Sequence, residues 1–278
     1  LSMIRQFYLV DEVGQTYFFD YRNNTLVSDI TDLGFSKNNT YLKYDDEYSL
    51  VKTENPQNTI QFKVVFLEGY KGYSNFLNFY RKASGDLRLF YKYDSSSKYC
   101  YVRIKSLSKT QLEAGAITSS LVLDKLSLWL SKESLTIKVN EDDNGKVFPF
   151  KYPYTYQATY NGTINITNNG ETKAPLNITI YGAVNNPTIE ILKGSVVISK
   201  LRLLVSHDDC EIEVSSEPRN QYMVMRAEEE ETNIYQYQDF TCDNFLFLDK
   251  GSYQIKFSPG VAEDTFCRIT KIESYSGH

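Results

Sequence analysis

Apolar and polar residues alternate along much of the chain, which is the period of a β-strand with one buried face. Residues 59–66 are the clearest case, because Ile60, Phe62 and Val64 share one face while Gln61 takes the other. Similar runs predict strands in both halves of the chain, at residues 4–10, 16–21, 87–93, 99–106, 136–139, 163–167, 176–180, 196–198, 201–205, 245–248 and 252–257. This pattern predicts a mainly β protein.

Polar turns separate these runs. Asp94–Lys98 follows the strand at 87–93, Asn168-Asn169-Gly170 marks a chain reversal, and Asp249-Lys250-Gly251 predicts a hairpin between 245–248 and 252–257. Regular short strands with turns between them indicate a sandwich or jelly roll in the second half.

One segment has the period of a helix. Tyr73, Phe76, Leu77 and Tyr80 recur at spacings of three and four residues, which places them on one helix face. We therefore expect a single helix near 73–83, with this face packed against the sheet.

A polar stretch at 140–145 separates the two halves, and Pro149 and Pro153 follow it. Such composition is typical of a hinge between domains. We predict an N-terminal domain over 1–140, a C-terminal domain over 141–278 and a hinge at 140–150.

Composition excludes several classes of protein. Aromatic residues make up 14% of the 278 positions, which argues against disorder. Lys and Arg number 30 against 35 Asp and Glu, a net charge of −5 that argues against specific nucleic-acid binding. No apolar run approaches the roughly 20 residues that a membrane span needs. No signal-peptide pattern is visible, and we expect Met3 to be the native start.

Catalytic motifs are absent. His207 is the sole internal histidine, and because Asp208 and Asp209 adjoin it in the chain, we interpret the three as a polar turn rather than a catalytic triad. No G-x-S-x-G, H-E-x-x-H or Walker sequence occurs. The sequence therefore predicts no enzyme and no catalytic, cofactor-binding or metal-binding residues.

Two further features have two interpretations each. Cys100, Cys210, Cys242 and Cys267 form no C-x-x-C pair, so they are either buried reduced thiols or include one long-range disulfide. Glu228–Glu231 is either a solvated loop or a contact for calcium or a partner.

The chain resembles the distal tail proteins of phages with long non-contractile tails, most closely those that infect Gram-positive bacteria. The stretches that carry this resemblance are 74–80 with 87–91, 121–130, and 164–182 with 186–189.

The resemblance implies a structural protein of the virion, at the distal end of the tail. The N-terminal part would be a β-rich belt with one helix, and six copies would close into a ring through which DNA passes. The C-terminal part would be a galectin-like or jelly-roll sandwich. Implied partners are the major tail tube protein, a tail-tip lysin or fibre protein, and receptor-binding or adaptor proteins. In some members the last strand, here 266–272, returns to the N-terminal part.

A ring requires one repeated heterologous contact that closes by rotation. We expect strand edges within residues 1–66 to form it, because unpaired backbone groups accept a neighbour's strand. Six copies at −5 would sum to −30, and a negative lumen would repel DNA.

The alternative function is a carbohydrate-binding adhesion module. Tyr152, Tyr154, Tyr156 and Tyr160 would be its aromatic platform, or else a strand face or interface. The His, Arg and Trp set of a galectin sugar site has no counterpart, since no Trp follows residue 150. A tail lysin fragment is a third hypothesis.

Overall fold

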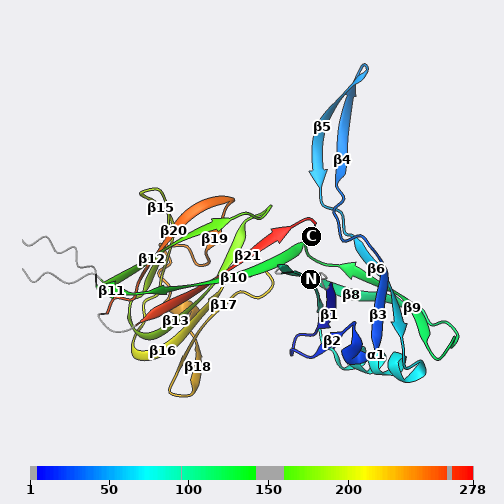
Figure 1. Cartoon of the computed structure of the whole chain (residues 1–278). Helices are drawn as coiled ribbons and strands as arrows, with labels where there is room; N and C mark the ends of the chain where they lie inside the picture. The colour runs from blue at the N-terminus through cyan, green and yellow to red at the C-terminus, as the bar shows by residue number, and fades with distance from the viewer. Residues whose placement is uncertain (1–4, 95, 142–159, 262–264, 278) are drawn as a thin grey trace, which may run out of the picture. The chain divides into compact units, whose positions relative to one another are not determined.

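The computed structural model describes residues 5–94, 96–141, 160–261 and 265–277. These residues form two compact units, each with its own hydrophobic core (Figure 1). Unit 1 comprises 1–131 with 274–278, and unit 2 comprises 132–273. Both consist largely of β-strands, so the predicted fold class is confirmed.

Unit 1 is built on one antiparallel sheet with neighbours in the order β2–β1–β7–β8–β9–β6–β3. A separate pair, β4–β5, projects from it as a hairpin (Figure 1). The strands are β1 (Gln6–Val10), β2 (Thr16–Phe18), β3 (Thr25–Thr31), β4 (Asn38–Tyr44), β5 (Glu47–Glu54), β6 (Thr59–Phe66), β7 (Leu87–Tyr93), β8 (Ser96–Leu107) and β9 (Ile117–Lys125).

The predicted helix is α1 (Tyr70–Lys82), which covers the core face of this sheet. Phe76 and Phe79 are buried, whereas Tyr80 is exposed, so the buried face lies one residue away from the predicted one. Gly69 begins the helix at φ +56°, where a Cβ atom would lie 2.9 Å from the Gly115 carbonyl oxygen. A glycine is required there because the backbones approach so closely.

Unit 2 is a β-sandwich whose two sheets share one core. In the first sheet the order is β18–β17–β16–β13–β21, with β19 paired to β13 and β10 beside β21; in the second it is β11–β12–β20–β14–β15. The strands are β10 (Trp129–Lys138), β11 (Asn140–Glu141), β12 (Tyr160–Asn168), β13 (Ala174–Asn185), β14 (Thr188–Lys193), β15 (Val196–Arg202), β16 (Ser206–Ser215), β17 (Tyr222–Ala227), β18 (Glu230–Asn233), β19 (Phe247–Leu248), β20 (Gly251–Ser258) and β21 (Phe266–Tyr275).

Two local predictions in this unit were wrong. The segments 245–248 and 252–257 do not form a hairpin, because β19 pairs with β13 while β20 pairs with β12 and β14. Leu246 and Leu248 are fully buried, which draws this segment into the core. The runs at 196–198 and 201–205 form one strand, β15, which ends at Arg202, while the turn after Asn168 leads into the other sheet.

The units divide between Ser131 and Lys132, within β10, and not at the predicted 140/141; most of the predicted hinge lies outside the described residues. Residues 266–272 stay in unit 2, where β21 pairs with β13. The return to unit 1 is made after them: the Lys98 ammonium lies 4.1 Å from the Tyr275 ring centroid, and Lys125 Nζ donates to the Ser276 carbonyl at 3.4 Å.

Candidate assembly surface

The β4–β5 hairpin closes through a two-residue turn at Asp45-Asp46. Asp45 has φ +49°, in the left-handed region that aspartate tolerates and two-residue hairpin turns require. The strands pair from Asn38–Glu54 to Tyr44–Glu47, with a bulge beside Tyr41. Backbone pairing along its whole length therefore defines the hairpin.

Large apolar side chains of this hairpin lie in solvent. Six of them are between 51% and 66% exposed: Tyr41, Leu42, Tyr44, Tyr48, Leu50 and Val51. Both faces are apolar, because Tyr41 and Tyr48 share one face, with ring centroids 6.5 Å apart, while Leu42 and Tyr44 lie on the other. An isolated two-stranded hairpin is marginally stable in water. Exposed apolar clusters of this kind mark interaction sites.

Side-chain contacts hold the base of the hairpin. Lys37 Nζ donates to Asn55 Oδ1 at 2.6 Å, and Ser36 Oγ donates to Asn58 Oδ1 at 3.0 Å. Ahead of the hairpin, the Trp129 indole N–H donates to the Leu33 carbonyl at 3.2 Å. The hairpin is thus mounted on a fixed base, although its strands have no core beneath them.

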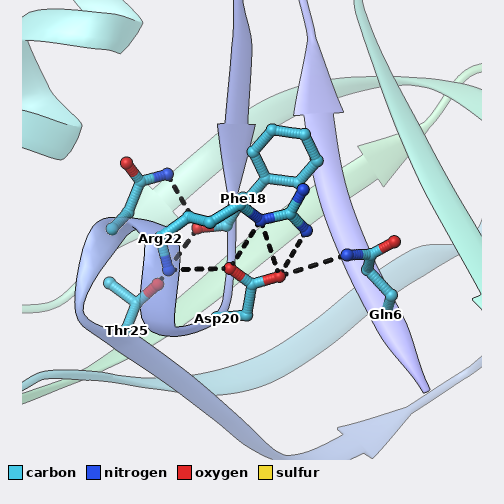
Figure 2. Close-up of polar contacts among 6 residues, drawn as sticks. Gln6, Phe18, Asp20, Arg22 and Thr25 are labelled. Carbon is cyan, nitrogen blue, oxygen red and sulfur yellow. Dashed lines mark hydrogen bonds and ion pairs between the residues drawn. The ribbon is translucent and has the colours of Figure 1, made fainter. Parts of the chain in front are cut away.

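A polar network fixes the turn between β2 and β3, where the 3₁₀ helix Tyr21–Asn23 begins (Figure 2). Asp20 accepts two-pronged hydrogen bonds from Arg22, at 3.0 Å from Nε and 2.5 Å from Nη2, and a third from Gln6 at 3.2 Å. The guanidinium carbon of Arg22 lies 3.3 Å from the Phe18 ring centroid. The Arg22 hydrogen bonds lower the pKa of Asp20 to about 2.

A row of aromatic side chains crosses the outward face of the same sheet. Directly paired residues place Phe18 beside Tyr8, Tyr8 beside Phe90, and Phe90 beside Tyr99, with centroids 5.2, 4.8 and 5.1 Å apart. We call these four residues the aromatic row. Burial raises the pKa of the Tyr8 hydroxyl. Tyr8, Phe18 and Phe90 are half-buried on this face, whereas Tyr99 is only 5% exposed.

The hairpin lies within the predicted region 1–66, although no strand was predicted at 38–54. Two signals mark it: the aromatic and aliphatic residues within 40–44 and 47–53, and the acidic turn Asp45-Asp46 between them. Its apolar residues serve no internal core, so the pattern alone did not show that they would be exposed.

The predicted chemical residues are dispersed. His207 lies in β16, where its Nδ1 accepts a local hydrogen bond from the Asp209 backbone at 3.2 Å. No group of three or more His, Cys, Asp or Glu residues that would hold a metal ion occurs within the described part of the chain. Nor does a helix long and apolar enough to cross a membrane occur there. Tyr152, Tyr154 and Tyr156 lie outside the described residues.

All four cysteines are free, and three of them are buried. Burial raises the pKa of Cys100 to about 12 and that of Cys210 to about 11, which keeps both thiols protonated. The buried reduced thiols expected from the sequence are therefore found, and the alternative disulfide is not formed.

The glutamate run forms an exposed turn. Glu228 and Glu229 have φ of +50° and +67°, and Glu230 begins β18. Glu231 accepts a hydrogen bond from Arg226 Nε at 2.8 Å, and Arg226 also contacts Glu211 and Glu213. The run is thus a solvated turn with one internal ion pair.

The two units differ in charge. Unit 1 carries 16 Lys and Arg against 14 Asp and Glu, which gives +2, and unit 2 carries 14 against 21, which gives −7. Six copies of unit 1 would therefore sum to +12. The net negative charge therefore belongs to the sandwich, and the negative lumen stays a prediction.

Comparison with known proteins identifies the N-terminal region. Residues 6–126 match the family model described as "Distal tail protein, N-terminal domain". No curated protein matches this sequence.

Two solved structures share the fold of almost the whole chain. A chain of the phage P2 baseplate in its activated conformation with calcium is 13% identical, with a TM-score of 0.71 over 99% of this chain and 100% of that one. The Dit hub protein of SPP1, a phage of Gram-positive bacteria, is also 13% identical, with a TM-score of 0.61 over 96% and 98%.

The fold of almost the whole chain is thus that of proteins of the phage baseplate and tail hub. More particularly, residues 6–126 are a distal tail protein N-terminal domain, and the resemblance drawn from the sequence is confirmed.

Proposed function

We propose that this chain forms a six-membered ring at the distal end of a phage tail, with unit 1 as the ring-forming part. The ring would continue the tail tube, let DNA pass, and join the tube to a tail-tip lysin or fibre protein. Unit 2 would project as the platform for receptor-binding or adaptor proteins. The protein would then have a purely structural role and would catalyse no reaction.

The exposed β4–β5 hairpin carries this proposal. Each large apolar side chain contributes about 1.5–3 kcal/mol when it becomes fully buried. A neighbouring copy supplies that burial without any further partner, and the same contact repeated around a rotation axis closes a ring. The ring therefore accounts for six apolar side chains that no core residue of their own unit covers.

The aromatic row is the surface that we propose receives the neighbour's hairpin. Its accessible part, at Tyr8, Phe18 and Phe90, is aromatic, whereas most outward positions on β6 and β9 are polar, such as Gln61, Lys63 and Ser120. Aromatic side chains on the hairpin and on the row provide matching contacts. A hairpin and a row at different places on one unit make the contact heterologous, as a ring requires.

Sedimentation of the purified full-length chain tests the ring. Six copies of 32.1 kDa give about 193 kDa (6 × 32.1). We expect this species for the wild type, and its loss when Tyr41→Lys and Leu50→Lys are combined. The matched control is Val13→Lys, at a 71% exposed turn position. A wild type that stays monomeric at high concentration and in purified tails, or a hairpin variant that still forms the ring, would contradict the proposal.

A further inference from the structure

β15 forms one edge of the second sheet of unit 2, and β14 is its paired neighbour. Its first three residues are aliphatic and exposed: Val196 is 65%, Val197 45% and Ile198 48% exposed. Three consecutive exposed aliphatic residues on a strand edge are a site where another strand adds unless something covers them.

The chain covers the second half of this edge with its own segment 237–243. Asp243 N donates to the Lys200 carbonyl at 2.8 Å, Asp239 N donates to the Arg202 carbonyl at 2.9 Å, and Leu204 N donates to the Tyr237 carbonyl at 2.5 Å. The Asp243 carboxylate also accepts a hydrogen bond from Lys200 N at 3.0 Å. An extended segment therefore already docks on this edge through backbone hydrogen bonds.

This cover stops before Ile198. Within the described part of the chain, no residue pairs with the outer edge of Val196–Ile198. The edge strand of the first sheet, β18, differs from β15 because its exposed residues Glu230 and Glu231 are charged. Charged residues block strand addition, and aliphatic ones favour it. The sandwich thus has one guarded edge and one open edge.

We propose that the open edge Val196–Ile198 binds an extended segment of another tail protein by β-strand addition. This inference rests on the proposed function, in that the chain lies among other tail proteins. The segment would continue the line of 237–243, with backbone hydrogen bonds to β15 and aliphatic side chains against the valines and the isoleucine.

The net charge of unit 2 favours another protein over a second copy of this chain as the partner at this edge. Unit 2 carries −7, so two copies of this unit meeting edge to edge would repel each other. A neutral or basic partner segment avoids that repulsion. A bulge in the β14–β15 pairing beside Leu192 bends the strand, so the added segment is short.

Site-specific photo-crosslinking in tails purified from the encoding phage tests this inference. Benzoylphenylalanine replaces Val197 in one preparation and Leu204 in the control, because Leu204 is 47% exposed but its edge is covered by Tyr237. We expect position 197 to cross-link to an extended segment of a different tail protein, in clear excess over position 204. Cross-links to another copy of this chain, or no excess over position 204, would overturn the inference.

Hydrogen exchange provides a readout of the backbone bonds themselves. The amides of 196–199 should exchange about tenfold more slowly in the tail than in the isolated protein. Equal exchange in both would show that no strand is added. A third probe at Tyr48 in the hairpin reports on the ring separately, so a failed edge and a failed ring give different cross-links.

The double variant Val197→Lys with Ile198→Lys then tests the consequence. Both side chains are exposed, so the isolated protein should keep its thermal stability. Tails that carry the variant should lose the partner identified at position 197, while tails that carry Leu204→Lys keep it. Retention of that partner by the double variant would count against the open edge.

Discussion

The β4–β5 and β17–β18 hairpins are both strand pairs at the surface, but they differ in burial and in the polarity of their exposed residues. β17–β18 stands on the sandwich through Met223, which is fully buried, and its outer surface is charged around Arg226. β4–β5 has no residue buried and is apolar on both faces. The first hairpin is packed within its own chain, whereas the second would be covered only in the ring that we propose.

The comparison extends to the units. Unit 2 holds the excess negative charge and leaves one short edge open, while unit 1 is nearly balanced and presents the hairpin. Charge of one sign keeps a surface from meeting its own copies. We infer that self-association belongs to unit 1 and that contacts with other proteins belong to unit 2.

Removal of β4–β5 is the strongest way to break this comparison. A short Gly-Ser linker in place of residues 38–54 should abolish the ring and leave the melting temperature of the single chain nearly unchanged, because the hairpin buries no core. The Lys37–Asn55 contact shows that a short linker spans the gap. Sedimentation and thermal unfolding measure the two effects. A ring that survives the deletion would refute the assignment.

Lys271→Met tests whether unit 2 depends on internal charge pairs. The side chain of Lys271 is 3% exposed and contacts Glu273 at 2.8 Å and Glu133 at 2.9 Å. Removal of the cation takes the Lys271 counter-charge away from the buried Glu273 carboxylate, which keeps its hydrogen bond from the Asn169 backbone N–H, so we expect a loss of about 3–5 kcal/mol in urea unfolding.

The matched control for Lys271 is Lys173→Met, which breaks the exposed pair with Asp249. It should cost less than about 1 kcal/mol. Sedimentation of both variants should show the wild-type ring, since both residues belong to unit 2. Equal losses of stability in the two variants would show that burial of the Lys271 pair does not increase its contribution.

Asp20→Asn tests the stability of unit 1 at a site outside the β4–β5 hairpin. The Asp20 pKa is lowered to about 2 in the folded state, so its stabilising effect is complete above the unfolded value of 3.8 and is lost as pH falls through about 2. Because the side chain is partly exposed, we expect about 1 kcal/mol near neutral pH. Urea titrations of both proteins from pH 2 to 7 should converge at the acid end. A difference as large at pH 2 as at pH 7 would show that the loss is not electrostatic.

Arg226→Met should produce the smallest change. Arg226 pairs with Glu211, Glu213 and Glu231, but 41% of its side chain is exposed, so we expect about 0.5–1 kcal/mol at low salt and less at 1 M NaCl. The control Lys52→Met, on the exposed hairpin, should change stability by less than about 0.5 kcal/mol. A cost at Arg226 that does not depend on salt would mean that its packing matters more than its charge.

The sequence by itself determined the β class, the single helix, most strand positions and the family resemblance. These depend on local periods and turn residues: Ile60, Phe62 and Val64 alternate toward the core as predicted. The same local information placed the helix within three residues of its observed start at Tyr70.

The tertiary structure alone decided which strands pair, where the units divide, and which apolar residues stay in solvent. Leu246 and Leu248 read as a hairpin arm, yet they enter the core beside β13, because strand partners are chosen by long-range packing. Tyr41 and Leu50 are residue types that also occur in the core strands, yet these two residues remain exposed. Whether a residue is buried depends on which residues pack against it in the folded structure. The order of residues along the chain does not show that.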